Sequence, residues 1–105
     1  MHYLTDATEI KNQINQFRSS KILWLDTEVA DCRTPNPRLS LIQVLATPDN
    51  NGESAFVFDV LDKPDLARYF IEQIMVNPRI EKVFHNASFD LKYLGGKLIP
   101  NVICT

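Results

Sequence analysis

The segment from Ile22 to Val29 constrains the fold most, because a run of large apolar residues ends in two acids. Apolar and β-branched residues between polar clusters favour a buried strand, in which alternate side chains point to the same face. Trp24, Asp26 and Glu28 therefore share one face. Neighbouring positions on that face lie roughly 7 Å apart, close enough for two carboxylates to hold a pair of metal ions about 4 Å apart.

The two acids are unusual at the end of an apolar strand. Buried charge is unfavourable unless it is paired or binds metal, and no Lys or Arg stands beside Asp26 and Glu28 to pair them. An alternative is that the strand ends at Leu25 and that both acids are solvated loop residues. Asp-x-Glu alone does not decide between a metal site and a loop.

Length and charge exclude several classes of protein. A chain of 105 residues forms one domain or part of one, with a small apolar core. We expect a cytoplasmic protein without membrane contact, because no apolar run reaches the roughly 20 residues of a span and the N-terminus lacks signal-peptide features. A net charge of -2 means that nucleic acid would be held by local contacts or by metal ions. Cys32 and Cys104 are expected to be reduced thiols.

The first half of the chain reads as a helix followed by three strands. Helical spacing of Ile10, Ile14 and Phe17 predicts an amphipathic helix over about 7–18. After the central strand and a proline-containing loop, we expect strands over 39–46 and 54–60, joined by a turn over 48–52 that ends in Asn-Gly. Three successive strands predict an antiparallel meander.

The second half alternates helices and strands. Pro64 suits the first turn of a helix whose apolar stripe runs from Leu66 to Met75. A short strand over 80–85 leads into a helix over 86–94, and 102–105 begins a last strand. We therefore predict an α/β fold with a mixed sheet, in which a meander of three strands precedes parallel strands and helices cover the faces.

Asp90 is the third acid of interest. It lies one turn into a helix that leaves a strand, and such junctions are where ligands collect in α/β sheets. Asn86 or Ser88 is the expected N-cap, and Asn86 would face the same cleft as Asp90 if the helix begins early. The alternative is an ordinary acid in a first helical turn, stabilised by the helix dipole.

Two separated stretches, 24–28 and 83–91, together resemble the first two motifs of the four-acid (DEDD-type) 3'-5' exonucleases, and the ribonuclease D branch in particular. The first motif is Asp-x-Glu at the end of a strand, and the second is Asn-x-x-(Tyr or Phe)-Asp at a helix start, which 86–90 matches. Residues 38–43 also resemble the second strand of that branch. Two motifs in agreeing contexts are far more specific than either alone.

The resemblance implies a ribonuclease H-like fold and covers only the front portion of the family domain. The third motif, a Tyr or His followed four residues later by the fourth acid, should come after the fifth strand, whereas this sequence ends at Thr105. We expect residues 1–105 to form a single partial exonuclease domain, C-terminally truncated, as either a fragment or a natural remnant.

By the same resemblance, the activity is removal of 5'-mononucleotides from a free 3' end. RNA is the expected substrate, with DNA as the alternative. Asp26 would bridge two divalent ions, Glu28 would bind the ion that carries the attacking water, and Asp90 would hold the other ion. Carboxylate ligands suit Mg²⁺ or Mn²⁺. The reaction would be metal-assisted hydrolysis of the terminal phosphodiester.

Four residues around the motifs are candidates for substrate binding: Thr27, His85, Asn86 and Phe89. His85 could touch a terminal nucleotide or be a hydrogen-bonded residue at the strand end. Phe89, four residues before Tyr93, could stack on a base or pack in the core.

Two other functions are compatible with these residues. A degenerate domain could bind nucleic acid or a protein without cutting, and apolar surface left open by the missing segment would favour self-association. An aspartate-nucleophile phosphatase also has Asp-x-acid after an apolar strand, although Glu28 stands where that chemistry needs a second Asp.

Overall fold

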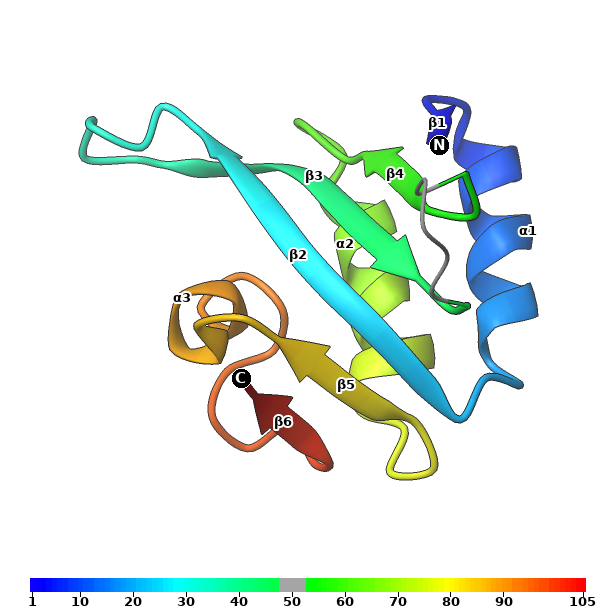
Figure 1. Cartoon of the computed structure of the whole chain (residues 1–105). Helices are drawn as coiled ribbons and strands as arrows, with labels where there is room; N and C mark the ends of the chain where they lie inside the picture. The colour runs from blue at the N-terminus through cyan, green and yellow to red at the C-terminus, as the bar shows by residue number, and fades with distance from the viewer. Residues whose placement is uncertain (48–52) are drawn as a thin grey trace.

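The computed structural model describes residues 1–47 and 53–105, so the turn predicted over 48–52 lies outside the described residues. Over these ranges the sheet has six strands in the order β1-β4-β3-β2-β5-β6 (Figure 1). The strands are β1 (His2–Leu4), β2 (Ile22–Ala30), β3 (Arg38–Leu45), β4 (Phe56–Asp59), β5 (Glu81–Phe84) and β6 (Val102–Cys104). The helical segments are α1 (Ala7–Phe17), α2 (Pro64–Phe70), the π-helical turn η1 (Ile71–Met75) and α3 (Ala87–Leu91).

Strand β2 organises the sheet, because it pairs antiparallel with β3 and parallel with β5. Strand β4 pairs antiparallel with β3, which confirms the predicted meander, and β6 continues the parallel half beside β5. The sheet is therefore mixed in the predicted sense.

One face of the sheet is covered and the other is open. Leu23 and Leu25 of β2 are buried against the helices, as are Ile42 and Val44 of β3. In Figure 1, α2 lies behind the sheet. The residues of β2 that alternate with Leu23 and Leu25 are less buried, and they belong to the opposite face, which is turned toward the viewer. The acids of β2 are on this open face, because their positions alternate with those of the buried leucines.

Helix α1 forms where the sequence predicts it. The carboxylate of Asp6 accepts a hydrogen bond from the N–H of Glu9 (3.0 Å), which caps the first turn. The predicted stripe of Ile10, Ile14 and Phe17 is buried against the sheet. Among the described residues, no helix is long and apolar enough to cross a membrane.

Two features of the fold differ from the sequence predictions. Strand β1 was not predicted, and it lies at the edge of the sheet, parallel to β4. The predicted helix from Pro64 to Met75 is α-helical only as far as Phe70 and then forms η1, in which the Val76 N–H donates to the Ile71 carbonyl (3.1 Å). An extra residue in this turn still leaves Ile74 and Met75 buried, so packing accommodates it.

The connection from β5 to α3 also corrects a prediction. Helix α3 covers five residues rather than 86–94, and Asn86 has a left-handed backbone (φ 61°) just before it. The side chain of Asn86 makes no capping hydrogen bond; its Oδ1 instead accepts from the Ser88 hydroxyl (3.2 Å). The N–H of Gly96, also at positive φ, donates to the Leu91 carbonyl (2.7 Å), which ends the helix.

Lys82 is an unexpected member of the core. Alternation along β5 places it on the covered face with Phe84, and its side chain is fully buried. Its ammonium group donates to the Asn77 carbonyl (2.8 Å). Burial lowers the pKa of Lys82 to about 8.

Candidate active site

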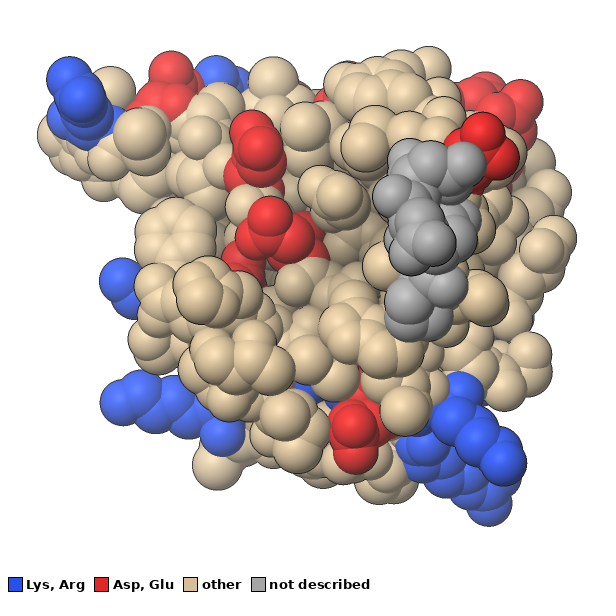
Figure 2. Space-filling view, viewed as in Figure 1, with Lys and Arg blue, Asp and Glu red and all other residues tan. Residues whose placement is uncertain are grey.

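Two acids of β2 lie on the open face of the sheet. Asp26 faces Gln43 of β3 across the strand pair, and Glu28 faces Leu41. Figure 2 shows acidic side chains gathered over the part of the sheet that β2 occupies in Figure 1, with Lys and Arg side chains toward the margins of the view. A hollow of about 230 Å³ adjoins both acids and is lined by Met1, Tyr3, Asp26, Glu28, Leu41, Gln43 and Val57.

The third acid reaches the same strand from α3. Strand β5 ends at Phe84, opposite Leu25, and the next turn of chain brings Asp90 back toward β2. The backbone N–H of Thr27 donates to Asp90 Oδ1 (3.1 Å), and the Thr27 hydroxyl donates to the same oxygen. Asp90 is only 2 % exposed. The two motifs, 63 residues apart, are therefore joined through Thr27.

The carboxylates of Asp26 and Asp90 are neighbours. The Thr27 N–H that faces Asp90 also donates to Asp26 Oδ1 (2.9 Å). The two acceptor oxygens therefore cannot lie more than about 6 Å apart. Burial raises the pKa of Asp90, and the charge of Asp26 raises it further, while the hydrogen bonds from Thr27 act in the opposite direction.

No Lys or Arg side chain of the described residues pairs with these acids. The ion pairs found over residues 1–47 and 53–105 involve Arg38 and Arg68, and neither pairs with an acid of the two motifs. Two close carboxylates without a basic partner repel one another, and here the repulsion disfavours the ionised form of Asp90. A bound cation would relieve both effects.

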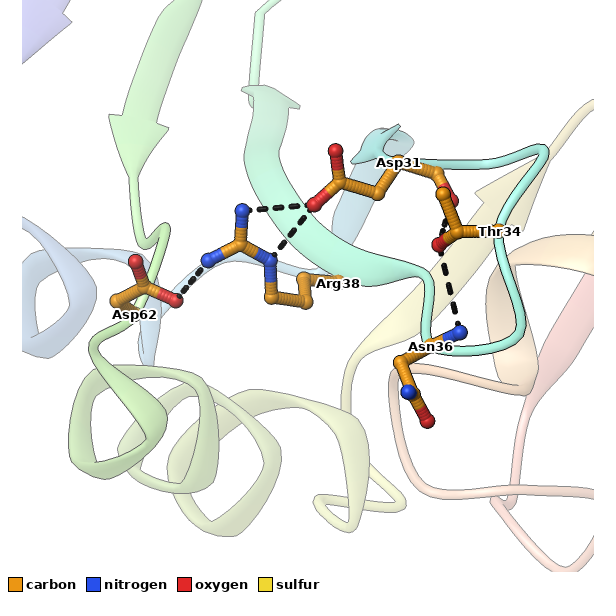
Figure 3. A network of polar contacts seen from close by, with 5 residues as sticks. All are labelled: Asp31, Thr34, Asn36, Arg38 and Asp62. Carbon is orange, nitrogen blue, oxygen red and sulfur yellow. Dashed lines mark hydrogen bonds and ion pairs between the residues drawn. The ribbon is translucent and has the colours of Figure 1, made fainter.

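A different charged cluster lies at the end of β2. Arg38 Nε (3.0 Å) and Nη2 (2.7 Å) both donate to Asp31 Oδ2, and Nη1 donates to Asp62 Oδ1 (2.6 Å). In the same loop the Thr34 hydroxyl donates to the Asp31 carbonyl (2.7 Å) and accepts from the Asn36 N–H (3.4 Å) (Figure 3). This cluster fastens the loop between β2 and β3 to the segment before α2.

The donor set fits a hard divalent cation. Carboxylate oxygens suit Mg²⁺ or Mn²⁺, and Mg²⁺ commonly uses one or two carboxylates and keeps several waters. Asp26 and Asp90 provide such a pair, and Glu28 lies along the same hollow as Asp26. Among the described residues, no group of three or more His, Cys, Asp or Glu side chains is gathered closely enough to form a complete site by itself. Water or substrate oxygens would have to complete the coordination.

The four predicted substrate-binding residues lie in different surroundings. Thr27 is buried and its hydroxyl donates a hydrogen bond to Asp90. His85 and Asn86 are exposed between β5 and α3. Phe89 is 40 % exposed, with the ring of Tyr93 5.9 Å away and the Lys92 ammonium 5.9 Å from its centroid. Over the described part of the chain, no hydrogen bond links His85, Asn86 or Phe89 to the acids.

Sequence reasoning missed two residues beside the acids. Gln43 faces Asp26 directly, and Tyr3 of the unpredicted β1 lines the hollow. The side chain of Gln43 makes no hydrogen bond within the described residues. Strand alternation placed Gln43 on one face, but only the pairing register, which depends on the bulge after Glu28, brings it opposite Asp26.

Comparison with known proteins decides the family. A family model described as 3'-5' exonuclease matches residues 1–105. The chain belongs to this 3'-5' exonuclease family. A ribonuclease D of Bartonella henselae is 35% identical over 104 residues, which are 96% of this chain and 24% of that protein. The match supports an exonuclease rather than an aspartate-nucleophile phosphatase.

Solved exonuclease structures share the fold. The catalytic core of RRP6 from Trypanosoma brucei has a TM-score of 0.77 at 20% identity, over 99% of this chain and 28% of that one. Escherichia coli RNase D, an exoribonuclease involved in structured RNA processing, has a TM-score of 0.70 at 26% identity, over 99% of this chain and 27% of that one. Brucella melitensis NrnC with bound Mg²⁺ has a TM-score of 0.61 at 20% identity, over 98% and 47%. These neighbours confirm the predicted ribonuclease H-like mixed sheet.

The chain spans less than a quarter of the length of the curated relatives it matches, 21% and 24% in two ribonucleases D.

Cys32 and Cys104 are free thiols, as predicted.

Proposed function

We propose that residues 1–105 form one part of a 3'-5' exonuclease domain that removes 5'-mononucleotides from the free 3' end of RNA. The observation that carries this proposal is the meeting of Asp26 and Asp90 at the N–H of Thr27. Acids from separate motifs share one donor without a cation, an arrangement that favours metal binding over a structural role. Membership of the exonuclease family supports the reaction, and the names of the relatives support RNA as the substrate.

Each acid has a role in this proposal. Asp26 lies between the other two, since it shares a backbone donor with Asp90 and a hollow with Glu28. It would bridge two divalent ions, with Glu28 on the ion nearer the attacking water and Asp90 on the other. When bound, such ions lower the pKa of water and stabilise the leaving oxygen.

The exposed residues after β5 would contact the end of the substrate. Phe89 presents part of its ring to solvent with Lys92 above it, a pairing of aromatic surface and positive charge that suits a base and its phosphate. His85 and Asn86 lie exposed beside it and would contribute polar contacts.

Release of mononucleotides from a short 5'-labelled RNA tests the proposal. We expect a ladder that shortens from the 3' end with Mg²⁺ or Mn²⁺, and no ladder with a chelator or a blocked 3' end. Asp26→Ala should abolish the ladder, whereas Asp65→Ala, at an exposed surface acid on α2, should not. Equal activity of wild type and Asp26→Ala would refute the assignment. The same oligonucleotide as DNA measures the preference for RNA.

A non-cutting role is the second candidate. It is favoured by the absence, among the described residues, of a ready-made group of three metal-binding side chains. RNA retained by the protein with divalent ions but never shortened would support this alternative.

We also propose that the open sheet face supports self-association. Tyr3, Ile22 and Ile103 are between 37% and 55% exposed, and all three lie on positions that alternate with the core. Sedimentation equilibrium tests this, with Ile103→Ser expected to shift the protein toward monomer.

A further inference from the structure

Thr27 is the residue through which the two motifs touch, and its side chain is not free to meet substrate. It is 7 % exposed and its side chain lies on the covered face of β2. Its neighbours along the strand, Asp26 and Glu28, point to the open face. Its backbone N–H faces Asp26 and Asp90, and its hydroxyl faces Asp90 alone.

All three contacts of Thr27 involve the Oδ1 atoms. Oδ1 of Asp90 receives both the N–H and the hydroxyl, so rotation of that carboxylate would break two hydrogen bonds. Oδ1 of Asp26 accepts a hydrogen bond from the same N–H. Fixing one oxygen of a carboxylate fixes the direction in which its second oxygen points. Such outer contacts to metal-binding carboxylates strengthen metal binding by orienting the ligands.

We propose that the hydroxyl of Thr27 is a positioning group, which holds the Asp90 carboxylate beside Asp26 in the orientation that binds a divalent cation. This proposal rests on the proposed function, because it assumes that the two acids hold a cation. It assigns to Thr27 a role different from the direct substrate contact predicted from the sequence.

The geometry favours a specific role over general packing. A hydroxyl buried in a sheet needs a partner, and a Val at this position would fit the β-branched shape and the strand while satisfying no carboxylate. Thr27 pairs across the strands with Ile42, whose side chain is fully apolar and buried. Packing and orientation can therefore be perturbed separately within one cross-strand pair.

Mn²⁺ affinity of the purified chain, followed by the electron paramagnetic resonance signal of the free ion, tests the proposal without any turnover. Thr27→Val should weaken Mn²⁺ binding by roughly tenfold or more, the range that loss of an outer contact to a metal ligand produces. Thr27→Ser, which keeps the hydroxyl, should bind nearly as well as wild type. Ile42→Val, which trims the cross-strand partner but leaves the hydroxyl, should also bind as wild type.

The outcomes separate this inference from the proposed function. Wild type that binds Mn²⁺, together with Thr27→Val of equal affinity, overturns the role of Thr27 and leaves the exonuclease proposal standing. Equal weakening by Thr27→Val and Ile42→Val also overturns it, since packing would then explain the loss. Wild type that binds no Mn²⁺ overturns both. Circular dichroism of each variant establishes that it is folded, and if Thr27→Val is not, Thr27→Ala with the Ser rescue takes its place.

Discussion

The two acidic clusters of this molecule differ in how their charge is balanced. At the loop after β2, Asp31 and Asp62 share one guanidinium, and all three side chains are largely exposed. At the middle of the sheet, Asp26 and Asp90 share the N–H of Thr27, and neither forms an ion pair with a described residue. In the first, the balanced cluster, a guanidinium contacts both carboxylates and offsets part of their charge. In the second, the unbalanced cluster, no basic side chain of the described residues offsets the charge, and one carboxylate is almost fully buried. Such an arrangement favours the binding of a cation.

The largest expected effect comes from removing charge at the unbalanced cluster. Asp90→Asn keeps the shape of the side chain and an oxygen for Thr27, but it removes a metal-binding charge. We expect RNA hydrolysis to fall roughly a thousandfold, since losing several kcal/mol of metal-derived stabilisation at 1.36 kcal/mol per tenfold gives this order. Asp62→Asn, at the balanced cluster, is the matched control and should leave the rate unchanged. A similar loss in both variants would erase the distinction between the clusters.

The same Asp90→Asn variant reports on repulsion in the metal-free protein. Because the folded-state pKa of Asp90 is raised, its contribution to stability is fully present below its ordinary range and is lost as pH rises through the raised pKa. The free energy of unfolding of Asp90→Asn should therefore increase relative to that of wild type as pH rises over that window. Urea titrations in the presence of chelator measure it. A free energy of unfolding of Asp90→Asn that falls relative to that of wild type as pH rises would contradict the sign.

A buried cation gives a further contrast. The ammonium group of Lys82 donates to a carbonyl and forms no ion pair with an acid of the described residues. Its pKa is about 8 in the folded chain against 10.5 in the unfolded chain, so the unfolded state binds more protons between these values. The free energy of unfolding should rise with pH across this window, by about 3 kcal/mol in full. Lys82→Met should abolish the rise and should be more stable than wild type at pH 7. Denaturant melts from pH 7 to pH 10.5 decide this, and a flat wild-type profile would count against a buried ammonium.

Divalent ions should stabilise the protein through the unbalanced cluster alone. At a concentration ten times the Kd, Mg²⁺ is expected to add about 1.4 kcal/mol to the free energy of unfolding. Asp26→Ala should lose this gain, whereas Arg38→Gln should keep it. Thermal melts with and without Mg²⁺ measure the effect, and stabilisation that survives in Asp26→Ala would place the ion elsewhere.

The smallest effect is expected at the balanced cluster. Arg38→Gln removes an exposed pair of contacts to Asp31 and Asp62, and such surface ion pairs contribute little. We expect a slight drop in Tm, smaller than the Mg²⁺ effect and diminished further by 0.5 M salt. A large, salt-independent loss would mean that the loop after β2 depends on this arginine for its fold.

Local patterns predicted much of the fold because they carry their own physical cause. The stripe of Ile10, Ile14 and Phe17 fixes both the helix and its buried side, and alternation along β2 fixes which side chains are buried. Strand β1 could not be predicted in this way, since its three residues have no period of their own and gain order only by pairing with β4. The stripe from Leu66 to Met75 fits an α-helix or a π-turn equally, so η1 was also hidden.

The sequence predicts candidate residues for the site but not the contacts between them. The two motifs identified Asp26, Glu28 and Asp90, yet nothing in their spacing indicates that Thr27 joins them. That contact depends on where β5 stops and on the left-handed Asn86, which are set by tertiary structure. The burial of Lys82 was not predicted, because a charged residue in a short strand is expected to face solvent. Lys82 lies two residues before the buried Phe84, so strand alternation places both side chains on the covered face.

The early end of β5 has a consequence for how this region tolerates insertions and deletions. Beyond Leu25 the flank of β2 meets a carboxylate where a neighbouring strand would otherwise continue. Two residues added to β5 would let its backbone pair with β2 beyond Leu25 and displace the Asp90 side chain. A shorter connection between β5 and α3 would not let Asp90 reach β2. The proposed site therefore depends on the length of chain between Phe84 and Asp90 as well as on the acids themselves.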